Sequence, residues 1–234
     1  MSPGPAVVVS CEHGGNAVPP EHAGLFAGQE ALLASHRGWD PGAAELARRL
    51  AEALGVAPLV ATVTRLLLEL NRSPGHPKLF SAITRPLPAA QRRTILAHYY
   101  EPHRRAVAAA VAAGLAQRGR VVHVACHSFT PVLDGTARKA DAGLLYDPRR
   151  PAEAALALAW QAELRRLAPG FRVRRNYPYR GAADGLPTWL RRRFGAHYLG
   201  MELEVNQRLP LADPAGWEEL QQALAVSLVA VIAR

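Results

Sequence analysis

Residues 121–131, which read Val-Val-His-Val-Ala-Cys-His-Ser-Phe-Thr-Pro, constrain the fold of this chain more than any other stretch. The β-branched apolar run that follows Gly119 predicts a buried strand, and the polar residues after it predict that the strand ends near His127. In open α/β sheets, ligands bind beyond the carboxyl ends of the strands. We therefore expect His127 at a ligand-binding edge, although a lone histidine there is also compatible with a hydrogen-bonded core residue.

The rest of the chain alternates strand-like and helix-like segments. Further strands are predicted at 6–9, 58–63, 66–70, 143–146, 171–175 and 198–205. Helices are predicted at 42–54, 89–117, 151–168, 186–194 and 214–234. This alternation predicts an α/β fold with a mostly parallel sheet, and because no linker or repeat interrupts it, we expect one domain over residues 1–234.

Composition narrows the classes of function. Lys and Arg number 28 against 19 Asp and Glu, which gives a net charge of +9 and raises the question of a nucleic-acid partner. The excess is mostly arginine scattered through predicted helices, and aromatic residues make up only 6%, which argues against a surface that stacks bases. We therefore expect small anionic substrates and no nucleic-acid partner.

The chain lacks the segments that would direct it to a membrane or a secretory route. No run of about eighteen apolar residues occurs, and residues 1–5 lack the charged start of a signal peptide. Cys11 and Cys126 are too few for a disulfide framework, so we interpret them as small buried residues, with metal ligation as the less favoured role. We expect a soluble, cytoplasmic monomer or small homo-oligomer.

A second polar motif follows the first predicted strand. Residues 10–16 read Ser-Cys-Glu-His-Gly-Gly-Asn, so that Glu12 and His13 stand beside two glycines. The glycines allow a tight turn while the two side chains stay free to ligate or to donate. The alternative is a glycine-rich turn with both side chains at the surface.

Asp40 precedes Pro41 at the start of the predicted helix 42–54. This placement favours a helix N-cap, which needs no ligand. Two histidines and one carboxylate are also a frequent zinc set, so Asp40 stays a candidate ligand beside His13 and His127.

Two other strand ends carry groups suited to a polar substrate. Asn71 and Arg72 follow the predicted strand 66–70, and a guanidinium in a cleft can hold a carboxylate through two hydrogen bonds. Asn176, Tyr179 and Arg180 lie in a turn after the strand 171–175, where they could orient a substrate. In a chain so rich in arginine, either guanidinium could equally be an exposed surface group.

The last predicted strand carries Glu202 and Glu204 on one face, because strand side chains alternate with a period of two. Glu204 could act as general base for a metal-bound water, or it could pair with an arginine. By contrast, His98 and His103 on the helix 89–117 and the arginines 191–193 are expected at the surface.

Six motifs in order along the chain resemble the N-formylglutamate amidohydrolase family. They are Ser-Cys-Glu-His-Gly-Gly-Asn at 10–16, His-Arg-Gly-Trp-Asp-Pro-Gly-Ala at 36–43, Leu-Asn-Arg-Ser at 70–73, His-Ser-Phe-Thr-Pro at 127–131, Asn-Tyr-Pro-Tyr-Arg-Gly at 176–181 and Glu-Leu-Glu-Val-Asn-Gln at 202–207. The resemblance implies a three-layer αβα sandwich with a mostly parallel mixed sheet, similar to the zinc carboxypeptidase (phosphorylase/hydrolase-like) fold. It also implies zinc, or another divalent metal, and hydrolysis of N-formyl-L-glutamate to formate and L-glutamate.

Carried over by position, the resemblance implies roles for particular residues. His13 and His127 would ligate the metal with a carboxylate from Asp40, which is preferred over Glu12 because family members often have Pro-His-Ala-Gly where this chain has Glu-His-Gly-Gly. Glu204 would be the general base. The remaining roles are substrate binding by Asn71, Arg72, Asn176, Tyr179 and Arg180, with Arg72 also stabilising the developing oxyanion. Glu69 departs from the family, which more often has Asp before Leu-Asn-Arg.

Other classes of function stay open at the level of sequence. One is a hydrolase of another acyl-amino acid or peptide-like amide, and another is a non-catalytic protein that binds an anionic ligand on the same fold. A serine hydrolase is disfavoured because no Gly-x-Ser-x-Gly elbow surrounds Ser128.

Overall fold

A computed structural model describes residues 4–233. Its strands are β1 (Ala6–Cys11), β2 (Leu59–Val60), β3 (Val121–Phe129), β4 (Val132–Leu133), β5 (Thr136–Ala137), β6 (Ala142–Leu145), β7 (Val173–Arg175) and β8 (Tyr198–Asn206). Its α-helices are α1 (Glu30–Ala34), α2 (Ala43–Leu54), α3 (Ala89–Ile95), α4 (Glu101–Arg118), α5 (Pro151–Leu167), α6 (Leu186–Phe194), α7 (Arg208–Ala212) and α8 (Pro214–Ile232). Short 3₁₀ or π turns are η1 (Pro20–Phe26), η2 (Leu96–Tyr100) and η3 (Gly195–His197).

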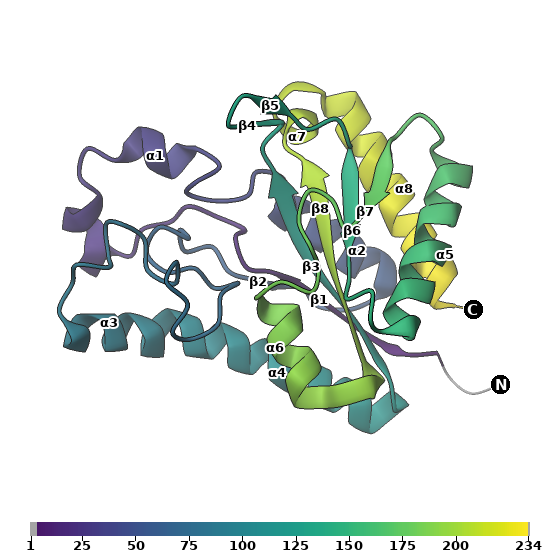
Figure 1. Ribbon diagram of the computed structural model, residues 1–234, viewed down its shortest axis with the longest axis horizontal. Helices are drawn as coiled ribbons and strands as arrows, with labels where there is room; N and C mark the ends of the chain where they lie inside the picture. The colour runs from purple at the N-terminus through teal and green to yellow at the C-terminus, as the bar shows by residue number, and fades with distance from the viewer. Residues whose placement is uncertain (1–3, 234) are drawn as a thin grey trace.

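The main sheet has six strands in the order β2-β1-β3-β8-β6-β7. Strands β2, β1, β3 and β8 run parallel, whereas β6 pairs antiparallel with β8 and parallel with β7. Helices cover both faces (Figure 1). These features confirm the predicted three-layer αβα fold with a mostly parallel mixed sheet.

The central strands place two different kinds of side chain on the two faces of the sheet. Val122, Val124 and Cys126 of β3 belong to the larger apolar core, together with side chains of α2, α5 and α8. On the opposite face, Val121 at the start of β3 packs in a smaller core with α4 and α6. Further along that face the side chains become polar, and His127 stands near the end of the strand. This face is therefore apolar at the start of the strands and polar toward their carboxyl ends, and we refer to the polar part, which contains His127, as the polar column.

A third apolar cluster supports a lobe beside this edge, at the left in Figure 1, where α1 and α3 lie. Its buried residues include Phe26, Ile95 and the leucines at 66–70. The predicted strand over 66–70 is wrong, because these residues form turns and irregular backbone. An apolar run this short does not distinguish a strand from a buried loop. The neighbouring prediction over 58–63 shrinks to the two residues of β2.

Three local predictions are corrected by burial and capping. Helix α2 begins after its N-cap Gly42, which is left-handed with a φ of 81°, and no side chain, Asp40 included, caps the helix. Arg191 is buried and bonds to Glu153 across the fold, instead of being solvated. His103 is not a surface residue, since its side chain is only 10% exposed and faces Glu12.

None of the helices within residues 4–233 combines the length and the apolar character needed to span a bilayer.

Candidate active site

His13, Asp40 and His127 come together at the carboxyl edge of the sheet. His13 follows the end of β1, and His127 lies in the neighbouring strand β3, which pairs in parallel with β1. Asp40 is positioned by its backbone N–H, which donates to the carbonyl of His13 at 2.9 Å. One ring nitrogen of each histidine and one carboxylate oxygen of Asp40 lie within 4.8 Å of one another.

The two imidazoles point the same ring nitrogen at a single carboxylate oxygen. Nδ1 of His13 lies 3.1 Å from Oδ2 of Asp40, and Nδ1 of His127 lies 3.0 Å from the same atom. The ring centroids are 5.0 Å apart, so both rings close around this point. The three side chains are 2–3% exposed, which leaves little water to solvate their charges.

The outer nitrogen of each imidazole faces a second carboxylate. Nε2 of His13 bonds to Oε1 of Glu69, and Nε2 of His127 lies 3.0 Å from Oε2 of Glu12. A carboxylate only accepts, so these contacts favour a proton on Nε2, and Nδ1 is the nitrogen that would face a bound cation beside Asp40. This is the orientation that carboxylates give to histidines that ligate metals.

Arg65 ties the carboxylates together. Its guanidinium donates to Oδ1 of Asp40 at 2.9 Å and to Oε2 of Glu69 at 2.6 Å. Burial opposes ionisation of both acids, but His13 and Arg65 more than offset it and hold the pKa of Asp40 and of Glu69 well below the usual range. Asp40 is thus a charged carboxylate at neutral pH.

The same environment favours a cation between the histidines. Burial alone would lower the pKa of His127, but hydrogen bonds with Asp40 and Glu12 raise it well above the ordinary value. For His13, burial and Arg65 favour the neutral form, and the carboxylates of Glu69 and Asp40 still raise its pKa. Positive charge is therefore stabilised where the two Nδ1 atoms meet.

This donor set fits a divalent metal ion. Catalytic zinc sites often have two imidazole nitrogens and one carboxylate oxygen as protein ligands and keep another position open. Carboxylates that accept from the outer nitrogens of the imidazoles commonly orient such ligands. Glu12 stands behind His127 and is fully buried, where it also accepts from Ser10 Oγ at 2.6 Å. The geometry therefore favours Asp40 over Glu12 as the third ligand.

Glu204 lies next to this group on β8, paired in register with His127. It is 6% exposed, and its Oε2 atom has no hydrogen-bond partner within residues 4–233. Burial raises the pKa of Glu204 to about 8, with Asp40 and Glu202 acting in the same direction. Glu204 therefore offers an unsatisfied carboxyl oxygen beside the candidate metal ligands.

The group opens into a cavity of about 370 Å³. Its walls include the two histidines, Asp40 and Glu204, and also Asn71, Arg72, Tyr179, Arg180 and Asp184. Arg72 is held by a bond from Nη1 to the carbonyl of Asp184 at 2.5 Å, and Tyr179 accepts from Arg138 at 3.1 Å. Two guanidinium groups at one polar cavity can bind an anionic ligand.

The predicted substrate residues divide into two groups. Asn71, Arg72, Tyr179 and Arg180 line the cavity, whereas Asn176 does not. Oδ1 of Asn176 accepts from the backbone N–H groups of Tyr146 and Gly181, both at 3.1 Å, which fixes the turn that carries Tyr179 and Arg180. In this structure, Asn176 positions the turn.

Sequence reasoning missed the surroundings of the candidate ligands. Arg65 and Glu69 had no assigned role, although opposite charges four residues apart are a visible signal. His103 bonds to Glu12 Oε1 at 3.2 Å from α4, and nothing in the sequence links these two residues.

The fold and the site together define a general class, an α/β protein with a buried histidine–carboxylate group above a polar cavity at the carboxyl edge of its sheet. The family model for N-formylglutamate amidohydrolase matches residues 5–210. The chain therefore belongs to the N-formylglutamate amidohydrolase family and is an amidohydrolase by family, which confirms the resemblance seen in the six motifs.

Two solved structures are similar over nearly the whole chain. A gene product from Agrobacterium tumefaciens is 26% identical with a TM-score of 0.78, over 97% of this chain and 92% of that chain. The N-formylglutamate amidohydrolase from Ralstonia eutropha is 21% identical with a TM-score of 0.70, over 99% of this chain and 95% of that chain, and this likeness is one of fold. A search of curated proteins found no match.

Proposed function

We propose that this protein is a zinc-dependent amidohydrolase of linear amides that converts N-formyl-L-glutamate to formate and L-glutamate. The observation that carries the proposal is the convergence of two Nδ1 atoms on Asp40, beside the unpartnered oxygen of Glu204, in a chain of this family.

His13, Asp40 and His127 are the residues that would hold the metal. A divalent ion bound there would polarise the amide carbonyl and make a bound water more acidic. Glu12 and Glu69 would hold the imidazoles from behind, and Arg65 would fix the orientation of Asp40. These outer contacts support a site that is ordered before substrate arrives.

Glu204 is the proposed general base and acid. With a divalent ion beside it, Glu204 would be ionised despite the burial that raises its pKa to about 8, and its Oε2 would take a proton from the attacking water as the oxygen bonds to the formyl carbon. The carboxyl then delivers that proton to the departing amide nitrogen as the C–N bond breaks. Formate keeps the original carbonyl carbon, and the amino acid leaves with a free amine.

The arginines of the cavity wall would select the substrate. N-formyl-L-glutamate has two carboxylates, and Arg72 and Arg180 both line the cavity with Asn71 and Tyr179 near them. A bidentate guanidinium contact with each carboxylate would align the formyl group with Glu204. Arg72 is also assigned to the developing oxyanion, since it lines the same cavity as Glu204.

A panel of three amides tests this proposal. Purified zinc-loaded protein is assayed for amine release from N-formyl-L-glutamate, N-formyl-L-glutamine and N-acetyl-L-glutamate. We expect kcat/KM to be highest for the first, at least about tenfold above the second, because the second lacks one carboxylate partner. Faster turnover of the acetyl compound, or of the glutamine compound, would contradict the proposed substrate.

A further inference from the structure

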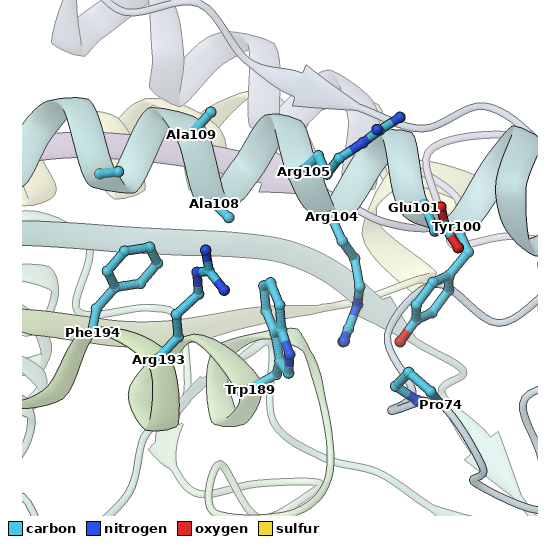
Figure 2. A pocket seen from close by; sticks show the side chains of 11 residues that line it. Pro74, Tyr100, Glu101, Arg104, Arg105, Ala108, Ala109, Trp189, Arg193 and Phe194 are labelled. Atoms are coloured by element: carbon cyan, nitrogen blue, oxygen red, sulfur yellow. The ribbon is translucent and has the colours of Figure 1, made fainter.

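A second cavity lies between α4 and α6, with a volume of about 590 Å³. Figure 2 shows its walls, with Arg104 reaching from α4, Tyr100 from the adjoining η2, and the rings of Trp189 and Phe194 from α6. None of its wall residues belongs to the cavity above the candidate metal ligands. It is a separate pocket with its own chemistry.

Arg104 is the unusual residue of this pocket. It is 4% exposed, and none of its three guanidinium nitrogens has a hydrogen-bond partner within the described part of the chain. The guanidinium lies over the ring of Tyr100, whose hydroxyl donates to the carbonyl of Arg72 at 2.6 Å.

The contacts that Arg104 does make are with aromatic faces. Its guanidinium carbon lies 4.7 Å from the ring centre of Tyr100 and 4.9 Å from that of Trp189. Such stacking stabilises a cation without using its N–H groups. Burial lowers the pKa of Arg104, as expected for a charge held out of water. A buried cation whose donors have no acceptor costs free energy unless a ligand satisfies them.

The remaining wall defines what kind of ligand would fit. Arg105 and Arg193 add positive charge, and Glu101 is the acidic residue of the lining. The rest of the wall is apolar, made by alanines of α4 and by Trp189 and Phe194. The pocket thus combines the buried guanidinium of Arg104 with a mostly apolar wall.

We propose that the pocket between α4 and α6 binds a small organic carboxylate with an apolar body, whose acid group pairs with Arg104. Because the guanidinium nitrogens are buried, the stacked and partly exposed side chain of Trp189 would have to turn aside to admit the acid group. A planar guanidinium binds a carboxylate through two parallel hydrogen bonds, and the apolar body packs against the alanines and Phe194.

The probe for this site is 4-phenylbutyrate, with 4-phenylbutyramide as its uncharged counterpart. Binding to the zinc-loaded native protein is measured by calorimetry and by tryptophan fluorescence. We expect saturable binding of the acid, with at least about tenfold weaker binding of the amide, since a hydrogen bond to a charged group is lost. The fluorescence change should disappear in Trp189→Phe.

Variants separate this pocket from the candidate active site. Arg104→Met should weaken binding of the acid at least tenfold, and Arg104→Lys should weaken it less because a cation remains. The matched control Arg118→Met changes an exposed arginine of the same helix and should bind as the native protein does. Arg180→Met should also bind normally.

Three results would overturn the proposal. They are equal binding of acid and amide, unchanged binding in both Arg104 variants, and loss of binding in Arg180→Met but not in Arg104→Met. The last result would place the probe in the candidate active site. Absence of saturable binding to the native protein at millimolar probe would overturn it as well.

Discussion

The two faces of the central sheet are built from the same strands and differ in almost everything else. On β8, Leu203 is fully buried in the larger apolar core, and its neighbour Glu204 points to the polar face beside His127. On β3, Cys126 and His127 divide in the same way. One face excludes water to stabilise the fold, whereas the other excludes water from groups that carry charge.

This difference separates the residues that stabilise the fold from those that carry the chemistry. Burial of apolar side chains on the first face contributes favourable free energy. On the second face, burial of charged groups costs free energy, which ion pairs offset for Glu12 and Asp40 but not for Glu204. The polar column is the part of the molecule that a protein selected for stability alone would not keep. Substitutions on the two faces should therefore have separable effects.

The largest expected effect is the loss of turnover in Glu204→Gln. The amide keeps the shape of the side chain but cannot accept the proton of water, so kcat should fall about 10²–10⁴-fold. Steady-state kinetics with N-formyl-L-glutamate measures this fall, and bound zinc and the urea midpoint should stay near native values. A fall smaller than tenfold with zinc still bound would exclude Glu204 as the base.

Leu203→Ala is the opposite case one residue away. Truncation of a fully buried leucine leaves a cavity, so the free energy of unfolding should fall by about 2–5 kcal/mol while kcat of the folded fraction stays near native. Urea unfolding measures the change. The control Leu211→Ala removes a leucine that is 65% exposed and should change stability by less than about 0.5 kcal/mol. Loss of kcat in folded Leu203→Ala would contradict the expectation that the two faces separately determine stability and turnover.

His123 allows a test of the polar face through pH. It lies between Ser10 Oγ at 2.8 Å and Tyr198 Oη at 2.6 Å, and burial lowers its pKa to about 4. The unfolded chain takes up a proton on this histidine near pH 6.5, whereas the folded chain does so only near pH 4. The free energy of unfolding should therefore be unaffected by this group above pH 6.5 and should fall by about 3 kcal/mol as pH drops from 6.5 to 4.

The measurement is the urea midpoint between pH 7 and 4 for native protein, His123→Gln and His98→Gln. The first variant should lose most of this acid dependence, and the second, at an exposed position, should keep it. Equal acid dependence in the native protein and His123→Gln would contradict a neutral buried imidazole at this position.

The smallest expected effect concerns the outer carboxylate behind His127. Glu12→Gln removes the charge that holds the proton on Nε2, so zinc affinity should fall about 10–100-fold. Competition with a fluorescent zinc chelator measures the affinity. The exposed residue Glu52 provides the control variant Glu52→Gln, which should bind zinc as the native protein does. Equal zinc affinities of Glu12→Gln and Glu52→Gln would contradict a role for Glu12 in supporting the metal ligand His127.

Local sequence patterns were sufficient for the strands that form the polar column. The β-branched runs before His13 and His127 and the two-residue period of Glu202 and Glu204 predicted both the strands and the shared edge. These features depend on neighbours in the chain. Apolar runs alone were less decisive, as the turn at residues 66–70 shows.

Long-range pairing explains what the sequence could not give. Asp40 looked like a helix cap because its nearest residues favour one, but Arg65 and the two histidines take its oxygens. Arg191 looked solvated because its partner Glu153 is 38 residues away in the chain. In both cases a distant charge decides the outcome, and no local pattern reports it.

Formate release before and after metal removal tests the central claim most directly. Native protein and the His127→Ala variant are treated with a chelator, desalted, and assayed with N-formyl-L-glutamate with and without added zinc. We predict that chelation abolishes release by native protein, that zinc restores it, and that zinc restores none in His127→Ala. Full release from metal-free native protein, or zinc-dependent release by the variant, would contradict a metal-dependent active site at His13, Asp40 and His127.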